Sequence, residues 1–148
     1  MIRNALPADV GVLRDLFRRS SLSNEGDREV LLAHPETLEW AGDGISDGRT
    51  RVAVADDRVV GFATTIAGDD ALELDDLFVD PDCLRQGVGR ALVADAAATA
   101  RRLGCRLDVT ANDHALAFYE QVGFVTDGFV DLEFGRGRRM HLAVDPDG

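Results

Sequence analysis

Residues 79–92 read VDPDCLRQGVGRAL, a segment in which a strand ends, a loop turns and a helix begins. Pro81 ends the apolar run before it, and Gly87 and Gly89 open a pattern of helical spacing that continues to residue 103. The free N–H groups at a helix start attract anions, and glycine lets a phosphate approach the backbone closely. Two arginines in the segment add positive charge. The segment therefore predicts a phosphate-binding helix start.

Outward from this segment, the apolar pattern changes between period two and helical spacing. The helical run joins two strand-like runs, so a right-handed crossover would make those strands parallel, while short turns predict antiparallel hairpins. We expect an α/β (α+β) protein with a mixed central sheet of about six or seven strands, helices on both faces, and the order β-α-α-β-β-β-α-β-α-β-β. The expected strands are 2–4, 51–55, 59–66, 72–79, 105–109, 124–134 and 138–144; the helices are 7–19, 25–34, 87–103 and 115–122; 37–48 ends in loop, and Gly135-Arg136-Gly137 is a turn.

The composition limits the class of protein. The chain has 148 residues, of which 45 % are hydrophobic, and this fits a single domain over 1–148. No apolar run approaches the roughly 20 residues of a membrane-spanning helix, and no secretory signal pattern is visible at the start. The 16 basic residues are all arginine, which excludes a P-loop lysine, a Schiff-base enzyme and a pyridoxal enzyme.

Charge and cysteine content bear on partners and location. A formal net charge of −11 opposes binding to nucleic acid or anionic membrane and mildly favours cationic substrates. The two cysteines make no disulfide framework, which suits a reducing cytoplasm. The three histidines have no metal-ligand spacing. We therefore expect a cytoplasmic protein without a metal, and neither nucleic acid nor membrane as a partner.

A dinucleotide is the alternative ligand for the Gly-x-Gly loop. Its fingerprint needs Gly-x-Gly-x-x-Gly directly after the strand, whereas the sixth position is Leu92 and seven residues separate Val79 from Gly87. Asp108 lies where a ribose-binding acid would fall, at a spacing that many strand–helix–strand units share. A plain helix start without a ligand is the other interpretation, and a second motif argues against both.

The second motif is residues 112–124, NDHALAFYEQVGF. Together with the strand–Pro–Arg-Gln-Gly-Val-Gly loop, it resembles the GNAT superfamily of acetyl-CoA-dependent N-acetyltransferases in spacing and element order, across nearly the whole chain. In one departure, the family's loop usually has Arg or Gln where this chain has Leu84. Because backbone N–H groups do most of the phosphate binding, the resemblance still implies acetyl-CoA as co-substrate.

The resemblance implies how acetyl-CoA would bind. The loop and helix start would wrap its pyrophosphate, and the preceding strand would pair with its pantetheine arm, with the Leu77 N–H polarising the acetyl carbonyl. Asn112 would contact pantetheine or steady the loop, and Phe118 would pack beside the cofactor. The implied cofactor-binding residues are Leu77, Phe78, Val79, Leu84, Arg85, Gln86, Gly87, Val88, Gly89, Arg90, Asn112, Ala115 and Phe118.

Direct acetyl transfer needs a base for the acceptor's ammonium and an acid near sulfur. The resemblance places Tyr119, the only tyrosine, as that acid; the alternative is that Tyr119 only belongs to the apolar stripe of its helix. Strand alternation puts Glu73, Asp75 and Leu77 on one face. Glu73 falls where histone-modifying members carry a glutamate base, Asp75 is nearer the thioester, and a water chain is the third option.

We therefore expect an N-acetyltransferase that acts on a primary amine of a small molecule or peptide by direct attack in a ternary complex. A catalytically silent acyl-CoA-binding sensor or regulatory module is the alternative, and a homodimer is an open possibility. Trp40 would wall the acceptor pocket or pack in the core. Residues 19–48 carry no motif tied to a chemical class of acceptor.

Overall fold

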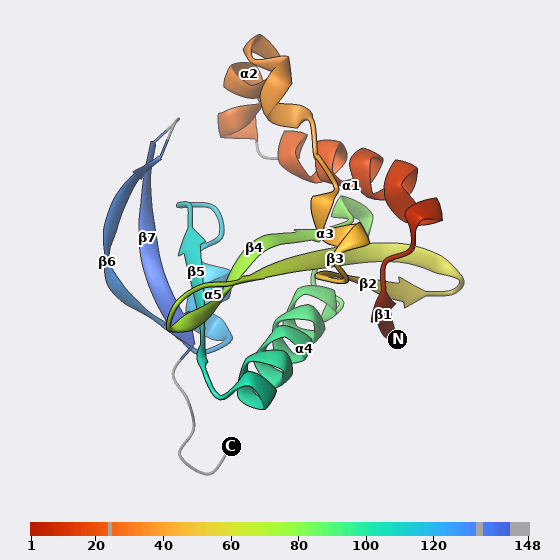
Figure 1. The fold of residues 1–148 in the computed structure, drawn as a ribbon. Coiled ribbons are helices and arrows are strands. Elements are labelled where there is room, and N and C mark those ends of the chain that lie inside the picture. Colours follow the sequence, from red (N-terminus) through yellow and green to blue (C-terminus); the bar gives the residue numbers. More distant parts are fainter. Residues whose placement is uncertain (24, 133–134, 143–148) are drawn as a thin grey trace. The chain divides into compact units, whose positions relative to one another are not determined.

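The computed structural model describes residues 1–23, 25–132 and 135–142 (Figure 1). Its strands form a seven-stranded sheet in the order β1-β2-β3-β4-β5-β7-β6. The pairing is antiparallel between β2 and β3 and parallel between β4 and β5, which confirms the predicted mixed sheet. The chain divides into two compact units, Met1–Thr64 with Asp76–Leu92, and Thr65–Asp75 with Val93–Gly148.

The elements follow the predicted order, with additional short helices. They are β1 (Ile2–Asn4), η1 (Pro7–Asp9), α1 (Val10–Leu22), α2 (Glu25–Ala33), η2 (Pro35–Leu38), α3 (Asp43–Ser46), β2 (Thr50–Ala55), β3 (Arg58–Ala67), β4 (Ala71–Val79), η3 (Pro81–Cys83), α4 (Val88–Leu103), β5 (Arg106–Ala111), α5 (Leu116–Gln121), β6 (Phe124–Leu132) and β7 (Gly135–Leu142). Residues 37–48 end in a turn before β2, as predicted, but the segment also contains the end of η2 and all of α3, which the sequence pattern did not predict. Helices this short have no repeating apolar face for a sequence pattern to reveal. In the part of the chain that the structure describes, no helix has the length and apolar character to cross a membrane.

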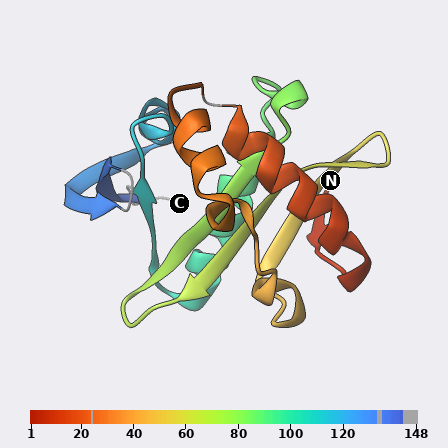
Figure 2. The ribbon, with the colours of Figure 1, turned by 90° about the horizontal axis from the view of Figure 1, so that it is seen from above.

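The core of the first unit lies between α1 and the strands β2 and β3. Leu13 and Leu16 of α1 are fully buried and pack with Val52 and Phe62. The Trp40 ring lies 4.9 Å from the Phe62 ring, centroid to centroid. Figure 2 shows α1 lying across β2 and β3. This packing fixes α1 against the strands and so determines which of its residues are left for polar contacts.

The predicted hairpin between β2 and β3 is confirmed. Asp56 and Asp57 form its turn with φ angles of 52° and 61°. Left-handed backbone at both central residues matches the twist of a two-residue hairpin, and aspartate tolerates it better than most side chains. The residues of the turn alone were therefore enough to predict this hairpin.

Gly61 of β3 lets the first turn of α4 approach the strand. An added Cβ would lie 2.8 Å from Cγ1 of Val88, 3.0 Å from the Phe78 carbonyl oxygen and 3.1 Å from Cδ1 of Leu92. We expect Gly61→Ala to lower the free energy of unfolding by about 1–3 kcal/mol, because the helix must shift to relieve the overlap. Urea denaturation measures this. Gly128→Ala is the control, since a Cβ at that strand glycine meets nothing within 4 Å; equal stability losses in both variants would contradict the prediction.

The second unit contains the parallel crossover and a C-terminal hairpin. β4 pairs with β5 from Ala71 to Leu74, and β7 pairs antiparallel with both β5 and β6. Leu107 and Val109 of β5 are each 2 % exposed, and Met140 of β7 is 1 % exposed. Strand alternation sends the intervening residues of β5, including Asp108, to the opposite face. That face carries a cluster of charged groups that includes Asp108, Glu73 and Arg139.

Two predicted boundaries in the second unit are wrong. The Gly135-Arg136-Gly137 turn is part of β7, where these residues pair with residues 130–132. Close packing, and not a turn, explains the glycine at position 137, because a Cβ there would lie 2.9 Å from Cδ1 of Leu132. The helix predicted at 115–122 is shorter, Leu116–Gln121, with Ala115 as its N-cap.

Candidate active site

The start of α4 has the backbone of an anion site. The Ala91 N–H donates to the Gly87 carbonyl at 3.0 Å, the first bond of the helix. The N–H groups of Val88, Gly89 and Arg90 come before it and have no partner inside the helix. The partial positive charge of the helix N-terminus is concentrated on these groups. The predicted phosphate site thus has the required donors in the first unit.

The loop before α4 takes a strained path. Gly87 has a φ of 82° and Arg85 a φ of 66°, both left-handed. A Cβ at Gly87 would meet nothing within 4 Å, so open space lies beside its backbone. Leu84, Arg85 and Gln86 are exposed. Left-handed residues in a turn direct successive N–H groups into a concave nest that suits an anion.

The end of β4 leads into this loop. Leu77, Phe78 and Val79 are half-buried. The Phe78 ring packs against Phe17 of α1 at 4.8 Å and against Phe62 at 5.5 Å. Phe78 therefore belongs to the core beneath α1. By strand alternation, its neighbours Leu77 and Val79 are on the other face of β4.

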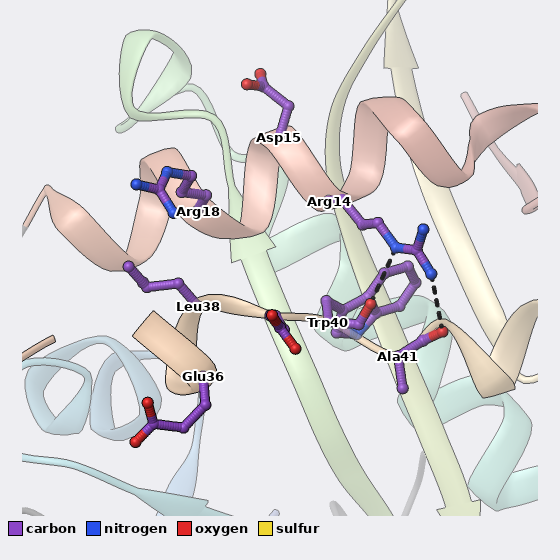
Figure 3. Close-up of a pocket in the computed structure, with 8 residues that line it drawn as sticks. Arg14, Asp15, Arg18, Glu36, Leu38, Trp40 and Ala41 are labelled. Carbon is purple, nitrogen blue, oxygen red and sulfur yellow. Dashed lines mark hydrogen bonds between the residues drawn. The ribbon is translucent and has the colours of Figure 1, made fainter. Parts of the chain in front are cut away.

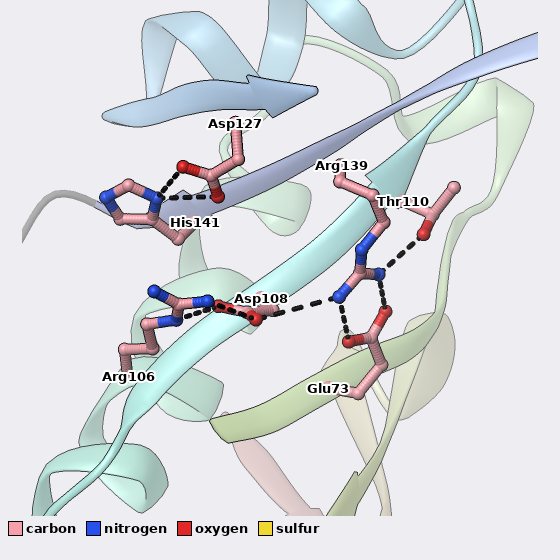
Figure 4. Close-up of polar contacts among 7 residues, drawn as sticks. All are labelled: Glu73, Arg106, Asp108, Thr110, Asp127, Arg139 and His141. Atoms are coloured by element: carbon pink, nitrogen blue, oxygen red, sulfur yellow. Dashed lines mark hydrogen bonds and ion pairs between the residues drawn. The ribbon is translucent and has the colours of Figure 1, made fainter. Parts of the chain in front are cut away.

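Glu73 of the second unit is held by Arg139 of β7 (Figure 4). Both guanidinium Nη atoms donate to its carboxylate, with Nη2 3.0 Å from Oε2. The same Arg139 donates to Thr110 Oγ1 at 2.7 Å. The Glu73 carboxylate in turn raises the pKa of Arg139. Both oxygens of this candidate base are thus committed to a cation.

The charged face continues on β5, β6 and β7. Asp108 is 6 % exposed. Its Oδ1 lies 2.8 Å from Arg106 Nε, and its Oδ2 lies 3.6 Å from Arg139 Nη2. Oδ1 accepts no well-aligned hydrogen bond despite this close contact. His141 Nδ1 lies 2.8 Å from both oxygens of Asp127. Figure 4 shows these groups alongside Glu73.

Asp75 differs from Glu73 in its surroundings. Its side chain is exposed, and the residues described in this structure make no hydrogen bond or ion pair with it. The pairs of β4 with β5 end one residue earlier, at Leu74 with Val109. Asp75 therefore lies just beyond the part of β4 that pairs with β5. Among the described residues, both of its carboxylate oxygens are available.

Tyr119 is in the core of the second unit. It is 6 % exposed, and its ring lies 5.3 Å from Phe118 and 5.2 Å from Phe124, both edge to face. Burial raises the pKa of Tyr119, so the hydroxyl keeps its proton. Just before α5, Asn112 Oδ1 accepts the Ala115 N–H at 3.0 Å. Tyr119 thus has a packing role, and its hydroxyl is protonated.

A surface groove of about 680 Å³ lies between α1 and the segment after α2 (Figure 3). Arg14 of α1 spans it, donating from Nε to the Trp40 carbonyl at 3.1 Å. The indole Nε1 of Trp40 donates to Asp76 at 2.9 Å, which anchors the ring to β4. Trp40 is 8 % exposed, belongs to the core cluster and also lines this groove; its role at an acceptor pocket stays a prediction. The groove is lined by Arg14, Asp15, Arg18, Glu36, Leu38, Glu39, Trp40 and Ala41.

Sequence reasoning missed two ion pairs, Arg139 with Glu73 and Arg19 with Asp80. Each joins residues more than 60 positions apart. For Arg139 with Glu73 the only signal was strand parity, which requires the register of β7 against β5 to be known. The pair of Arg19 with Asp80 depends on how α1 packs, for which the sequence has no local signal. Among the described residues, no group of three or more His, Cys, Asp or Glu could hold a metal ion.

Residues 12–124 match the family model described as Acetyltransferase (GNAT) family. The chain belongs to this family, as its two motifs predicted. A peptidyl-lysine N-acetyltransferase, YjaB of Salmonella typhimurium, is 35 % identical over 99 residues, which are 66 % of this chain and 65 % of the relative. The match therefore spans less than two thirds of that relative's length.

Solved structures share the fold. A GCN5-related N-acetyltransferase from Rhodopseudomonas palustris has a TM-score of 0.79 at 24 % identity, over 97 % of this chain and 95 % of that one. The PaiA N-acetyltransferase of Thermoplasma acidophilum, in complex with coenzyme A, has a TM-score of 0.77 at 19 % identity, over 97 % of this chain and 98 % of that one. These likenesses confirm the predicted GNAT fold.

Proposed function

We propose that this chain transfers an acetyl group from acetyl-CoA to a primary amine of a small molecule or peptide, by direct attack in a ternary complex. The start of α4 carries the proposal, with its uncommitted N–H groups and the open space beside Gly87. Membership of the GNAT family supports it. The name of the YjaB relative, a peptidyl-lysine N-acetyltransferase, supports an amine acceptor.

On the donor side, the pyrophosphate of acetyl-CoA would bind to the backbone of residues 86–90. The backbone of Leu77, Phe78 and Val79 would pair with the pantetheine arm, and the Leu77 N–H would stabilise the oxyanion that forms at the acetyl carbonyl. Exposed Arg85 and Arg90 would add charge for the phosphates. The predicted contributions of Asn112, Ala115 and Phe118, in the second unit, remain predictions.

On the acceptor side, the groove along α1 supports binding of the amine. Its lining carries three carboxylates, from Asp15, Glu36 and Glu39. Asp15 is paired with Arg19, and Glu36 lies 3.4 Å from His34. The Glu39 carboxylate makes no hydrogen bond or ion pair with the residues that the structure describes. Carboxylates at the rim would attract an ammonium group, in keeping with the net charge of −11.

For proton transfer, Tyr119 would donate to the departing CoA thiolate, and a carboxylate or water would take the ammonium proton. The contacts favour Asp75 over Glu73 for the second role. Asp75 has both oxygens available, whereas Glu73 would have to share its carboxylate with Arg139. Once the amine is neutral, its nitrogen forms the C–N bond and the C–S bond to CoA breaks. The nitrogen then loses a second proton, which balances the proton that Tyr119 gives to the thiolate.

The test is thiol release from acetyl-CoA with a panel of polyamines, aminoglycosides, amino acids and amino-terminal or lysine-containing peptides. We expect release with at least one class of amine, and mass spectrometry of the product to show one added acetyl group. If CoA stabilises the chain against heat but no amine causes thiol release from acetyl-CoA, the proposal is contradicted and a silent acyl-CoA sensor is favoured.

Gly89→Trp tests the donor site. A bulky side chain in the first turn of α4 would block the approach of pyrophosphate to the backbone. We expect the variant to lose the thermal stabilisation that acetyl-CoA gives to the unmodified chain. Gly11→Trp is the matched control, because Gly11 is an exposed glycine near the start of α1 with nothing within 4 Å of an added Cβ. A folded Gly89→Trp variant with undiminished stabilisation would place the ligand elsewhere.

A further inference from the structure

Asp80, at the end of β4, carries a carboxylate that is completely buried, with 0 % exposure. Arg19 of α1 donates to both of its oxygens, at 3.0 Å and 3.1 Å. The Asp82 N–H donates to Oδ1 at 2.9 Å, and Arg58 Nη2 lies 3.5 Å from Oδ2. The Arg19 guanidinium lowers the pKa of Asp80 against the opposing effect of burial. This is a buried, ionised and fully partnered carboxylate.

The backbone of Asp80 is held as firmly as its side chain. Its N–H donates to the Val60 carbonyl of β3 at 2.8 Å, and its own carbonyl accepts the Cys83 N–H at 2.8 Å. Side chain and backbone together fix the point where β4 ends and η3 turns. Only residues 84–87 then separate η3 from the start of α4. Anchoring one end of so short a connection restricts its conformations, including the left-handed residues Arg85 and Gly87.

Arg19 reaches this anchor from a distant part of the sequence, 61 positions away. Its Nε donates to Asp15 one turn earlier on α1, at 2.8 Å. Asp15 thus orients the guanidinium, leaving both Nη groups for Asp80. A planar fork that bonds two oxygens at once fixes direction as well as distance, which a lysine ammonium cannot do.

We propose that Arg19 is a positioning residue for phosphate recognition: through Asp80 it holds residues 84–87 in the conformation that receives the pyrophosphate of CoA before the ligand arrives. The inference rests on the proposed function, because it concerns the same ligand. A site ordered in advance avoids the free-energy cost of ordering on binding. Arg19 then affects affinity for the phosphates without contacting them.

The test is NMR titration, which also measures weak binding, with CoA and with pantetheine, which lacks the phosphates. We expect Arg19→Gln to weaken CoA binding by about 10- to 100-fold, the size of effect that small displacements in a preorganised site produce. Pantetheine binding is expected to change by less than about twofold, since its predicted contacts are elsewhere. Arg19→Lys keeps the positive charge but lacks the planar guanidinium that bonds two oxygens at once. Its CoA affinity should therefore lie between that of Arg19→Gln and that of the unmodified chain.

Arg3→Gln is the matched control. Arg3 also pairs through both Nη atoms with one carboxylate, Asp9, at 2.8 Å and 3.2 Å, in the same unit. It should leave CoA binding unchanged. Arg19→Gln leaves the Asp80 carboxylate buried without its main partner. The second variant therefore combines Arg19→Gln with Asp80→Asn, which removes the buried charge. We expect this double variant to fold and still to lose CoA affinity.

The outcomes separate the two proposals. CoA affinity within twofold of the unmodified chain in the folded double variant would overturn the positioning role. Two other results would also overturn it. One is that Arg19→Gln weakens the binding of CoA and of pantetheine equally, and the other is that Arg3→Gln weakens CoA binding as much as Arg19→Gln does. Either result would indicate a general effect of lower stability. If the unmodified chain itself binds no CoA, the proposed function fails instead.

Discussion

Tyr119→Phe is expected to lower the turnover number by about 10²- to 10⁴-fold, the usual contribution of a positioned general acid. The substitution removes only the hydroxyl and keeps the ring between Phe118 and Phe124. Acetyl-CoA affinity should hardly change. Steady-state thiol release with the amine found in the screen measures the effect, together with a binding titration for acetyl-CoA.

The packing interpretation of Tyr119 makes the opposite prediction. If the ring only fills the core, turnover stays within a few-fold of the unmodified chain. A thermal melt is the control, because the phenylalanine keeps the buried ring surface. A large fall in melting temperature would attribute lost activity to unfolding, and turnover would then be compared at a temperature where both proteins are folded.

Asp75→Asn is expected to lower turnover by about 10²- to 10⁴-fold and to flatten the acidic limb of the rate–pH profile. Asparagine keeps the shape of the side chain but cannot take a proton. Glu73→Gln is the matched comparison on the same strand face. Because Arg139 already occupies the Glu73 carboxylate, we expect Glu73→Gln to keep the acidic limb and to change the rate only a few-fold.

Each alternative for the base has a distinct signature. If Glu73→Gln removes the limb and Asp75→Asn leaves it intact, the two roles are exchanged, and Arg139 must release the carboxylate during turnover. If neither variant alters the limb, the proton goes to water, or the amine arrives already neutral. The rate–pH profile therefore distinguishes Glu73, Asp75 and water as the base, whereas the rate at a single pH does not.

The sequence predicted those parts of the fold that have local signals. The left-handed Gly104 ends α4, and the left-handed Asp56 and Asp57 make the hairpin turn. A glycine in a strand carries an ambiguous signal, and Gly137 was therefore assigned to a turn although it serves close packing in β7.

The candidate site was predictable only where its motifs are continuous in sequence. The loop before α4 is one segment, so its donors followed from the spacing of Gly87 and Gly89. The partners of Glu73 and Asp80 come from residues 66 and 61 positions away. Such pairs depend on strand register and on how a helix packs, and composition or periodicity contains neither.

The ion pair of the buried Asp80 with Arg19 makes the stability of the fold depend on pH in strong acid. Its pKa is lowered in the folded chain, so the ion pair with Arg19 stabilises the fold at every pH above the unfolded value of about 3.9. That stabilisation is lost only as the pH falls through the folded value. Arg19 has a raised pKa and stays charged on the alkaline side. Between about pH 5 and 9 the anchor does not titrate, so a change of rate with pH in this interval does not come from the ion pair of Asp80 with Arg19.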